Sequence, residues 1–212
     1  MANWQEIMTF IGESNRDVKL LEGDEKTGRE ECFDLNIPEK SLLYEIVCNT
    51  GGIVIDDWIR IFGQTKDNIG ISHYNKEFGA SHEMTGLFVV ASDIVGGLFA
   101  ININRFEDEA NSIWYFAPDT LEWECLEMKY SEFFSWALQG NIDEFYETMR
   151  WNGWKKDAKE VGFDQGILIY PFLWANECII DNADKKAVPF DELVALNFEN
   201  EKRLFEDIYD EK

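Results

Sequence analysis

Apolar residues near the start of the chain recur at the spacing of one helix face. Four of them follow the i, i+3, i+4, i+7 pattern, and they are Trp4, Ile7, Met8 and Ile11. Asn3 and Glu6 occupy the N-cap and N3 positions of this run, where each side chain can accept from the other's backbone N–H. The pattern predicts a short amphipathic helix with a capping box.

A second helix is predicted after Pro38, which suits a first helical turn because its missing N–H would be unpaired there. Its buried face consists of apolar residues, namely Leu42, Leu43, Ile46 and Val47. Asn49-Thr50-Gly51-Gly52 ends this helix, since glycine accepts the left-handed backbone of a helix C-terminus. Between the two helices, the charged stretch from Glu22 to Glu31 contains two glycines and predicts an exposed loop.

Strand patterns begin at Ile53. A β-rich run extends from there to Phe62, with Asp56 and Asp57 in its middle. Residues 87–91 and 98–103 predict two more strands around the Gly96-Gly97 turn. Residues 113–117 and 121–126 flank Pro118-Asp119-Thr120 and predict a hairpin, whose second strand alternates apolar and acidic residues as in an antiparallel sheet.

Helical patterns return after these strands. One face is formed by Tyr130, Phe133, Phe134, Ala137 and Leu138, with Gly140 at its end. Asn141 and Glu144 predict a further capping box and helix. Residues 167–170 predict a last strand, and Pro189 leads into a terminal helix.

Strands grouped between helices favour an α+β fold, with a mainly antiparallel sheet flanked by N-terminal and C-terminal helices. Because no Ser- or Pro-rich linker interrupts the chain, we expect one domain over residues 1–212.

The chain carries 42 acidic and 19 basic side chains, a formal net charge of −23. A field of this sign repels phosphate backbones, so we expect no nucleic-acid partner. It would attract a basic protein, although solubility alone explains the charge as well. The N-terminus has no signal-peptide pattern, and no apolar run approaches the roughly 20 residues of a membrane helix. We therefore expect a soluble cytoplasmic protein without a membrane partner.

Cysteines and histidines do not form a recognisable metal or redox motif. The cysteines are Cys32, Cys48, Cys125 and Cys178, with no C-x-x-C pair, and their apolar contexts predict reduced thiols. His73 and His82 match no zinc spacing. Phosphate-loop, nucleophile-elbow and metalloprotease motifs are missing as well. We expect no metal and no cofactor, and no catalytic residue can be named.

Among the many carboxylates, Asp56, Asp57 and Asp93 have the least generic positions, within or at the end of predicted strands. Adjacent strand residues point to opposite faces, so Asp56 and Asp57 could serve one substrate atom only at a bulge. Edge-strand charge or turn capping is the favoured explanation of these residues.

Tryptophans gather in the C-terminal half of the chain. Most should lie in the core, because aromatic side chains gain much free energy on burial. Trp151 and Trp154 flank Gly153 just after a predicted helix end, where full burial is harder. Core packing is the favoured interpretation of both, and an interface anchor is the alternative if they are exposed.

Five blocks of residues carry a family resemblance. They are residues 50–63, 87–100, 115–123, 164–174 and 187–189. The most specific are Tyr115-Phe116-Ala117-Pro118-Asp119-Thr120-Leu121-Glu122-Trp123 and Tyr170-Pro171-Phe172-Leu173-Trp174. Together the blocks resemble the bacterial family catalogued as domain of unknown function 2625. Where the family pattern has a His-Gly pair before the tryptophan, this chain has Asp56-Asp57-Trp58. The resemblance implies a fold and no established reaction.

The order of helix, Gly-Gly, strand and tryptophan from Pro38 to Gly63 is also similar to the opening of the Smi1/Knr4-like (SUKH) superfamily. That superfamily includes many bacterial immunity proteins, which bind and neutralise toxin domains. This similarity is one of fold alone.

Three function classes follow from these patterns. The leading hypothesis is a non-catalytic acidic protein-binding module, such as an immunity protein neutralising a basic toxin domain. Its contacts would come from acids in residues 22–31, 107–109 and 206–211, together with Trp151 or Trp154. The alternative is a small-molecule-binding protein or enzyme with an acidic and aromatic pocket near four residues, which are Asp56, Trp58, Asp93 and Asp119. A third is a structural subunit that oligomerises through its aromatic surface.

Overall fold

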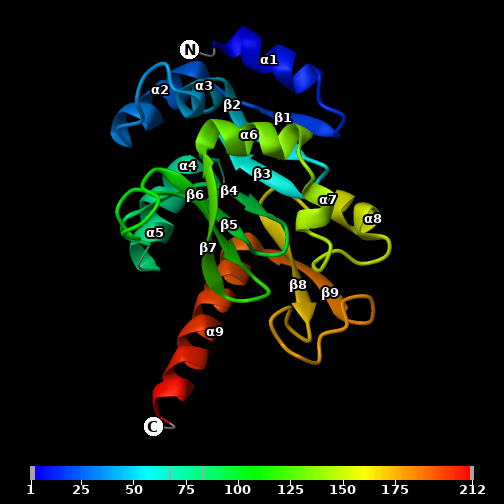
Figure 1. Cartoon of the computed structure of the whole chain (residues 1–212). Coiled ribbons are helices and arrows are strands. Elements are labelled where there is room, and N and C mark those ends of the chain that lie inside the picture. Colours follow the sequence, from blue (N-terminus) through cyan, green and yellow to red (C-terminus); the bar gives the residue numbers. More distant parts are fainter. Residues whose placement is uncertain (1–2, 67, 83, 211–212) are drawn as a thin grey trace.

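A seven-stranded antiparallel sheet forms the centre of the computed structural model. The structure describes residues 3–66, 68–82 and 84–210, and in the last helix it describes side chains as far as residue 204. The strands lie in chain order and each pairs with the next (Figure 1). They are β1 (Val18–Glu22), β2 (Thr50–Ile55), β3 (Ile59–Phe62), β4 (Leu87–Asp93), β5 (Leu98–Asn102), β6 (Ser112–Ala117) and β7 (Glu122–Lys129). A separate hairpin pairs β8 (Gln165–Tyr170) with β9 (Asp184–Pro189).

Helices cover both faces of the sheet, which confirms the α+β prediction. On one face lie α1 (Trp4–Gly12), α3 (Leu42–Asn49) and α6 (Tyr130–Gln139). Phe133 of α6 packs there on Phe99 of β5, with ring centres 4.8 Å apart. On the other face lie α4 (Ile71–Asn75), α5 (Glu77–Ser81) and α9 (Phe190–Asp210). Phe198 of α9 packs on Phe116 of β6, with ring centres 4.7 Å apart. The remaining helices are α2 (Glu25–Asp34), α7 (Ile142–Phe145) and α8 (Trp154–Lys159). Among the described residues, no helix has both the length and the apolar composition needed to cross a bilayer.

The predicted capping box at the start of α1 is confirmed. The Asn3 side chain accepts from the Glu6 N–H at 3.0 Å, and the Glu6 carboxylate accepts from the Asn3 N–H at 3.2 Å. The second helix begins later than predicted, because Ser41 rather than Pro38 opens it. The Ser41 hydroxyl accepts from the Tyr44 N–H at 3.1 Å, and Pro38 lies in the preceding turn.

The prediction of an exposed loop over residues 22–31 was wrong, since most of this stretch is α2. Asp24 caps the helix by accepting from the Thr27 N–H at 2.9 Å. Gly28 lies directly against α3, where a Cβ would come within 2.6 Å of the Cys48 Cα. The glycine that suggested a loop therefore allows two helices to touch. Cys32 and Cys48 meet at this contact, with their sulfur atoms 4.0 Å apart.

Asp56 and Asp57 form the turn between β2 and β3 rather than the middle of a strand. Their φ angles are 52° and 55°, a left-handed conformation that aspartate adopts more readily than most residues. The prediction of strand geometry at these two residues was therefore wrong. The following Trp58 is fully buried.

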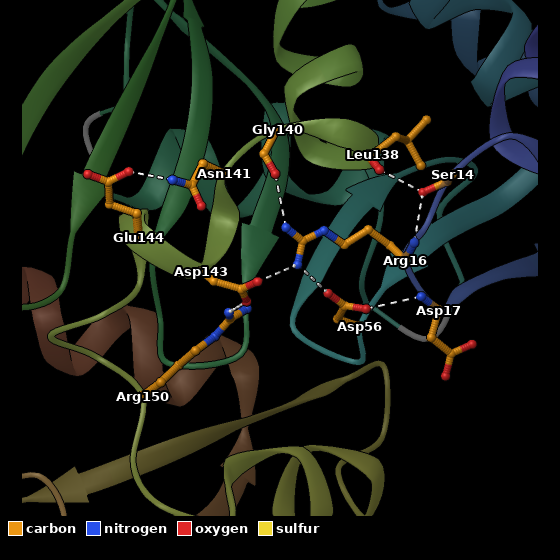
Figure 2. A network of polar contacts seen from close by, with 10 residues as sticks. All are labelled: Ser14, Arg16, Asp17, Asp56, Leu138, Gly140, Asn141, Asp143, Glu144 and Arg150. Atoms are coloured by element: carbon orange, nitrogen blue, oxygen red, sulfur yellow. Dashed lines mark hydrogen bonds and ion pairs between the residues drawn. The ribbon is translucent and has the colours of Figure 1, made fainter.

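The predicted capping box at Asn141 is wrong as well. The α7 helix spans only Ile142–Phe145, and the Asn141 side chain makes no capping bond to the helix backbone. Its amide instead donates to the Glu144 carboxylate (Figure 2).

Candidate functional site

Arg16 links three parts of the fold that are distant in sequence (Figure 2). Its Nη1 donates to Asp56 Oδ2 at 2.9 Å and to Asp143 Oδ2 at 3.3 Å. Its Nη2 donates to the Gly140 carbonyl at 2.9 Å, at the end of α6, where the helix leaves carbonyls unpaired. The guanidinium therefore fastens the segment before β1 to the β2–β3 turn and to α6.

Arg150 continues this network into the protein interior. Its Nη1 donates to Asp143 Oδ1 at 2.6 Å, and its side chain is only 6% exposed. The guanidinium carbon lies 3.9 Å from the centre of the Trp154 ring and 4.8 Å from that of Trp58. Nε and Nη2 have no hydrogen-bond partner among the described residues, and the ring faces take that place. Burial lowers the pKa of Arg150.

Trp58, Trp151 and Trp154 form one cluster around this arginine. The Trp58 ring lies 5.9 Å from Trp151 and 5.1 Å from Trp154. Trp151 is buried and donates from Nε1 to Asp157 Oδ2 at 2.7 Å, while Trp154 is half-buried. The idea of two exposed tryptophan anchors is corrected here, because Gly153, with a φ of 92°, turns the chain so that both rings pack against Trp58.

Asp93 is a completely buried carboxylate with four donors. Oδ1 accepts from the N–H groups of Val95 at 3.0 Å and Gly97 at 2.9 Å. Oδ2 accepts from the hydroxyls of Tyr115 at 2.6 Å and Tyr146 at 3.1 Å. Burial raises the pKa of Asp93, although each of these bonds opposes the shift. The carboxylate stabilises the β4–β5 turn. It is not exposed to solvent, so a substrate could not reach it.

The structure thus brings together most of the residues singled out in the sequence. Trp58, Trp151 and Trp154 surround Arg150, and Asp56 joins them through Arg16 and Asp143. Asp93 connects to the same cluster through Tyr146, whose ring lies 5.4 Å from Trp58. This assembly stabilises the fold, and none of its members lines the open clefts described next.

Asp119 lies near enough to Asp93 to be affected by its charge, and it lines an open cleft of about 630 Å³. We call it the acid–aromatic cleft, and its lining residues are Asp119, Thr120, Tyr170, Pro171, Phe172, Trp174, Ala175, Asn176, Glu177 and Leu204. They come from the β6–β7 turn, the end of β8, the β8–β9 loop and α9. Burial is the main cause that raises the pKa of Asp119, and the nearby negative charge of Asp93 adds to it.

A second open cleft, of about 740 Å³, lies between the α2–α3 connection, β4, β5 and the start of α6. We call it the apolar cleft, and its lining residues are Leu35, Asn36, Ile37, Pro38, Ser41, Leu42, Leu43, Phe88, Ile101, Ile103, Asn111, Lys129, Tyr130 and Ser131. None of these is acidic, and Lys129 alone is charged. Asp34, Glu39, Lys40 and Glu132 are exposed and directly follow or precede lining residues in the chain. Three acids and one lysine therefore flank an apolar floor.

Sequence reasoning missed both clefts except for Asp119. The aromatic residues from Tyr170 to Trp174 were noted only for the family resemblance, and the Tyr-Pro-Phe-Leu-Trp pattern is the signal that could have marked them. The apolar cleft left no signal, because its walls come from four separate stretches of the chain. Arg16 and Arg150 were missed since their partners are up to 127 residues away in sequence.

Fold and clefts together define an acidic α+β protein built on a meandering antiparallel sheet. The chain belongs to the family described as protein of unknown function DUF2625, whose profile matches residues 1–193. The family resemblance is thereby confirmed.

Two relatives share most of this chain. The uncharacterized protein YbfG of Escherichia coli K12 is 32% identical over 177 residues, which cover 81% of this chain and 80% of YbfG. An uncharacterized protein of Haemophilus influenzae is 29% identical over 212 residues, which cover 97% of this chain and 92% of the relative. No solved structure matches significantly, so the SUKH-like similarity stays a prediction.

Proposed function

We propose that this protein is a non-catalytic binding module for a basic protein partner, which docks at the apolar cleft. The net charge of −23 supports this proposal, because it accelerates encounter with a cationic protein. A basic toxin domain is one partner of this kind, and binding would neutralise it by covering its functional surface. The cleft itself supplies the more specific support.

The apolar cleft carries the proposal through its composition. In a chain with 42 acidic residues, its lining contains none, while three exposed acids (Asp34, Glu39 and Glu132) and one exposed lysine (Lys40) lie next to lining residues in the chain. Ile103 on its wall is 52% exposed. An apolar centre surrounded by charged groups is the usual anatomy of a protein interface. A partner with an apolar anchor between lysines or arginines would fit it.

The acids proposed as contacts from the sequence have different surroundings. Those of residues 22–31 lie mainly on α2, where Glu25 pairs with Arg29 at 2.6 Å. Residues 107–109 are exposed in the β5–β6 loop, two residues before the cleft residue Asn111. The side chains of 206–211 lie outside the described part of the chain. We therefore propose that, of the three acidic segments, the β5–β6 loop contacts the partner.

Two matched variants test this function. Ile103→Lys places a cation in the cleft, whereas Ile179→Lys changes an isoleucine of similar exposure (64%) in the β8–β9 loop, at the other end of the molecule (Figure 1). We expect the wild-type protein and Ile179→Lys to retain one basic protein in equal amounts when recovered from their own host cell at low salt. Ile103→Lys should reduce its recovery at least tenfold, because like charges repel across the interface.

Quantitative mass spectrometry of the recovered material provides the measurement. Thermal melting of both variants serves as a control, because two exposed substitutions should leave the melting temperature nearly unchanged. Equal recovery by both variants, or the absence of a stoichiometric basic protein, would contradict the proposed function.

A further inference from the structure

The acid–aromatic cleft lies at the opposite end of β6 and β7 from the apolar cleft. Asp119 and Thr120 belong to the turn between these strands, whereas Ser112 and Lys129, at their other ends, adjoin or line the apolar cleft. Tyr170 ends β8, and the loop from Pro171 to Glu177 forms the facing wall. The two clefts are therefore separate sites with different chemistry.

Three aromatic side chains line one wall of this cleft, and they are Tyr170, Phe172 and Trp174. Tyr170 is 61% exposed and meets Phe172 edge-on, with ring centres 5.6 Å apart and an interplanar angle of 87°. Phe172 in turn stacks on Trp174 at 5.4 Å. The Trp174 indole N–H is buried and has no hydrogen-bond partner among the described residues. Aromatic rings that gather on one wall of an open cleft, with Tyr170 exposed among them, form a surface on which a ligand could stack.

Among the lining residues that the structure describes, the charged groups are both carboxylates. Asp119 and Glu177 line it, and none of its lining residues is basic. Lys185 of β9 is held elsewhere, because its ammonium donates to the carbonyls of Ile180 at 2.6 Å and Ala183 at 2.7 Å. Asp119 is half-buried, and burial raises its pKa even though hydrogen bonds from its own backbone and from Thr148 oppose the shift, so its charge remains costly. A cation in the cleft would offset that cost.

We propose that the acid–aromatic cleft binds a small organic cation, one that joins an amidinium or guanidinium group to a flat ring. The cationic group would lie against the Asp119 carboxylate, since a planar, forked donor matches carboxylate geometry. The flat part would lie on the exposed Tyr170 ring. The cleft volume of about 630 Å³ is in the range of small-molecule sites. This site does not depend on the proposed docking of a basic protein.

Benzamidine and its neutral isostere benzamide are suitable probes. In titrations of the full-length protein followed by nuclear magnetic resonance, we expect saturable shifts with benzamidine at residues of the β6–β7 turn and the β8–β9 loop. Benzamide should bind at least tenfold more weakly, because it has the ring without the charge. Equal affinity for both probes would contradict a cation site.

Variants locate the site within the protein. Asp119→Asn should weaken benzamidine binding about tenfold, and Tyr170→Ala about fivefold. Asp108→Asn is the matched control, because it removes one exposed negative charge in the β5–β6 loop and should leave the affinity unchanged. Because Tyr170 is exposed, Tyr170→Ala should fold normally. Its benzamidine affinity therefore tests the site even if Asp119→Asn fails to fold.

Three outcomes would overturn the proposal. They are the absence of saturation with benzamidine, equal weakening by Asp108→Asn and Asp119→Asn, and unchanged affinity in Tyr170→Ala. Ile103→Lys separates this site from the proposed function, since it should leave benzamidine affinity intact even where it abolishes protein docking.

Discussion

Replacement of Asp93 by alanine should lower the free energy of unfolding by about 4 kcal/mol. The substitution leaves four buried donors without an acceptor, namely the N–H groups of Val95 and Gly97 and the hydroxyls of Tyr115 and Tyr146. Each such group costs about 1–3 kcal/mol, and the sum is smaller because neighbouring losses are not additive. Urea denaturation followed by circular dichroism measures the change. A loss below about 1 kcal/mol would contradict the structural role of this carboxylate.

The Asp93→Asn variant separates shape from charge. Its amide oxygen can still accept from the Val95 and Gly97 N–H groups, so the free energy of unfolding should fall by about 1–2 kcal/mol at neutral pH.

Burial raises the pKa of Asp93, so the folded state binds its proton more readily than the unfolded chain does. The contribution of Asp93 to stability therefore falls as the pH rises above the ordinary value of 3.8 through the raised folded pKa. Asp93→Asn should accordingly lose more stability relative to wild type at pH 4 than at pH 7, and a smaller loss at pH 4 would contradict the sign of the shift.

Replacement of Arg60 by alanine should lower the free energy of unfolding by about 3–4 kcal/mol and loosen the β8–β9 hairpin. Arg60 is fully buried on β3, and its guanidinium donates to the carbonyls of Gly162 and Gln165. It also lies 5.9 Å from the centres of the Phe163 and Phe190 rings. Burial lowers the pKa of Arg60 to about 10, which leaves it charged at neutral pH. The side chain is therefore a buried polar link between the sheet and the hairpin, beside the backbone bond from the Ile167 N–H to the Ile94 carbonyl.

Hydrogen exchange measured by mass spectrometry checks this role. In Arg60→Ala, amides of β8 should exchange at least tenfold faster than in the wild-type protein, while those of β5 and β6 should change much less. Arg60→Lys is the control, because it keeps the charge but cannot reach both carbonyls with a planar fork, and it should give an intermediate effect. Uniform acceleration across the whole sheet would show a global loss of stability instead and would contradict the hairpin link.

Periodicity predicted much of the fold, wherever apolar side chains repeat on one face. The residues of α6 that share its predicted face are all buried, and they are Tyr130, Phe133, Phe134, Ala137 and Leu138. The hairpin around Pro118-Asp119-Thr120 became β6 and β7, because the turn residues and the alternation of Glu with apolar residues agree. Local patterns were sufficient in these elements.

Elements without a repeating apolar face were missed or misread. Helix α2 buries only Gly28 and Cys32, so its charged surface looked like a loop. Strand β9 has mostly exposed side chains and acquires its structure by pairing with β8. The turn at Asp56 was hidden within an apolar run, because β2 and β3 are buried on both faces. Tertiary contacts, rather than a local pattern, determined the secondary structure of these segments.

The difference between local patterns and distant contacts also explains which parts of the clefts the sequence could predict. Asp119 was recognised from its turn, a local feature, whereas the facing Tyr170 and Trp174 lie about fifty residues further along the chain. The burial of Trp151 depends on Trp58, which is almost a hundred residues earlier in the chain. Single residues in a sequence do not indicate such distant contacts.

The salt dependence of partner binding tests the proposed function most directly. Calorimetric titration of the wild-type protein with the recovered basic partner, at 50 mM and at 500 mM NaCl, measures the dissociation constant under weak and strong screening. We predict that Kd rises at least tenfold at the higher salt concentration, because the acidic surface attracts the partner through charges that salt screens. A dissociation constant that is the same at both concentrations would contradict an acidic docking module.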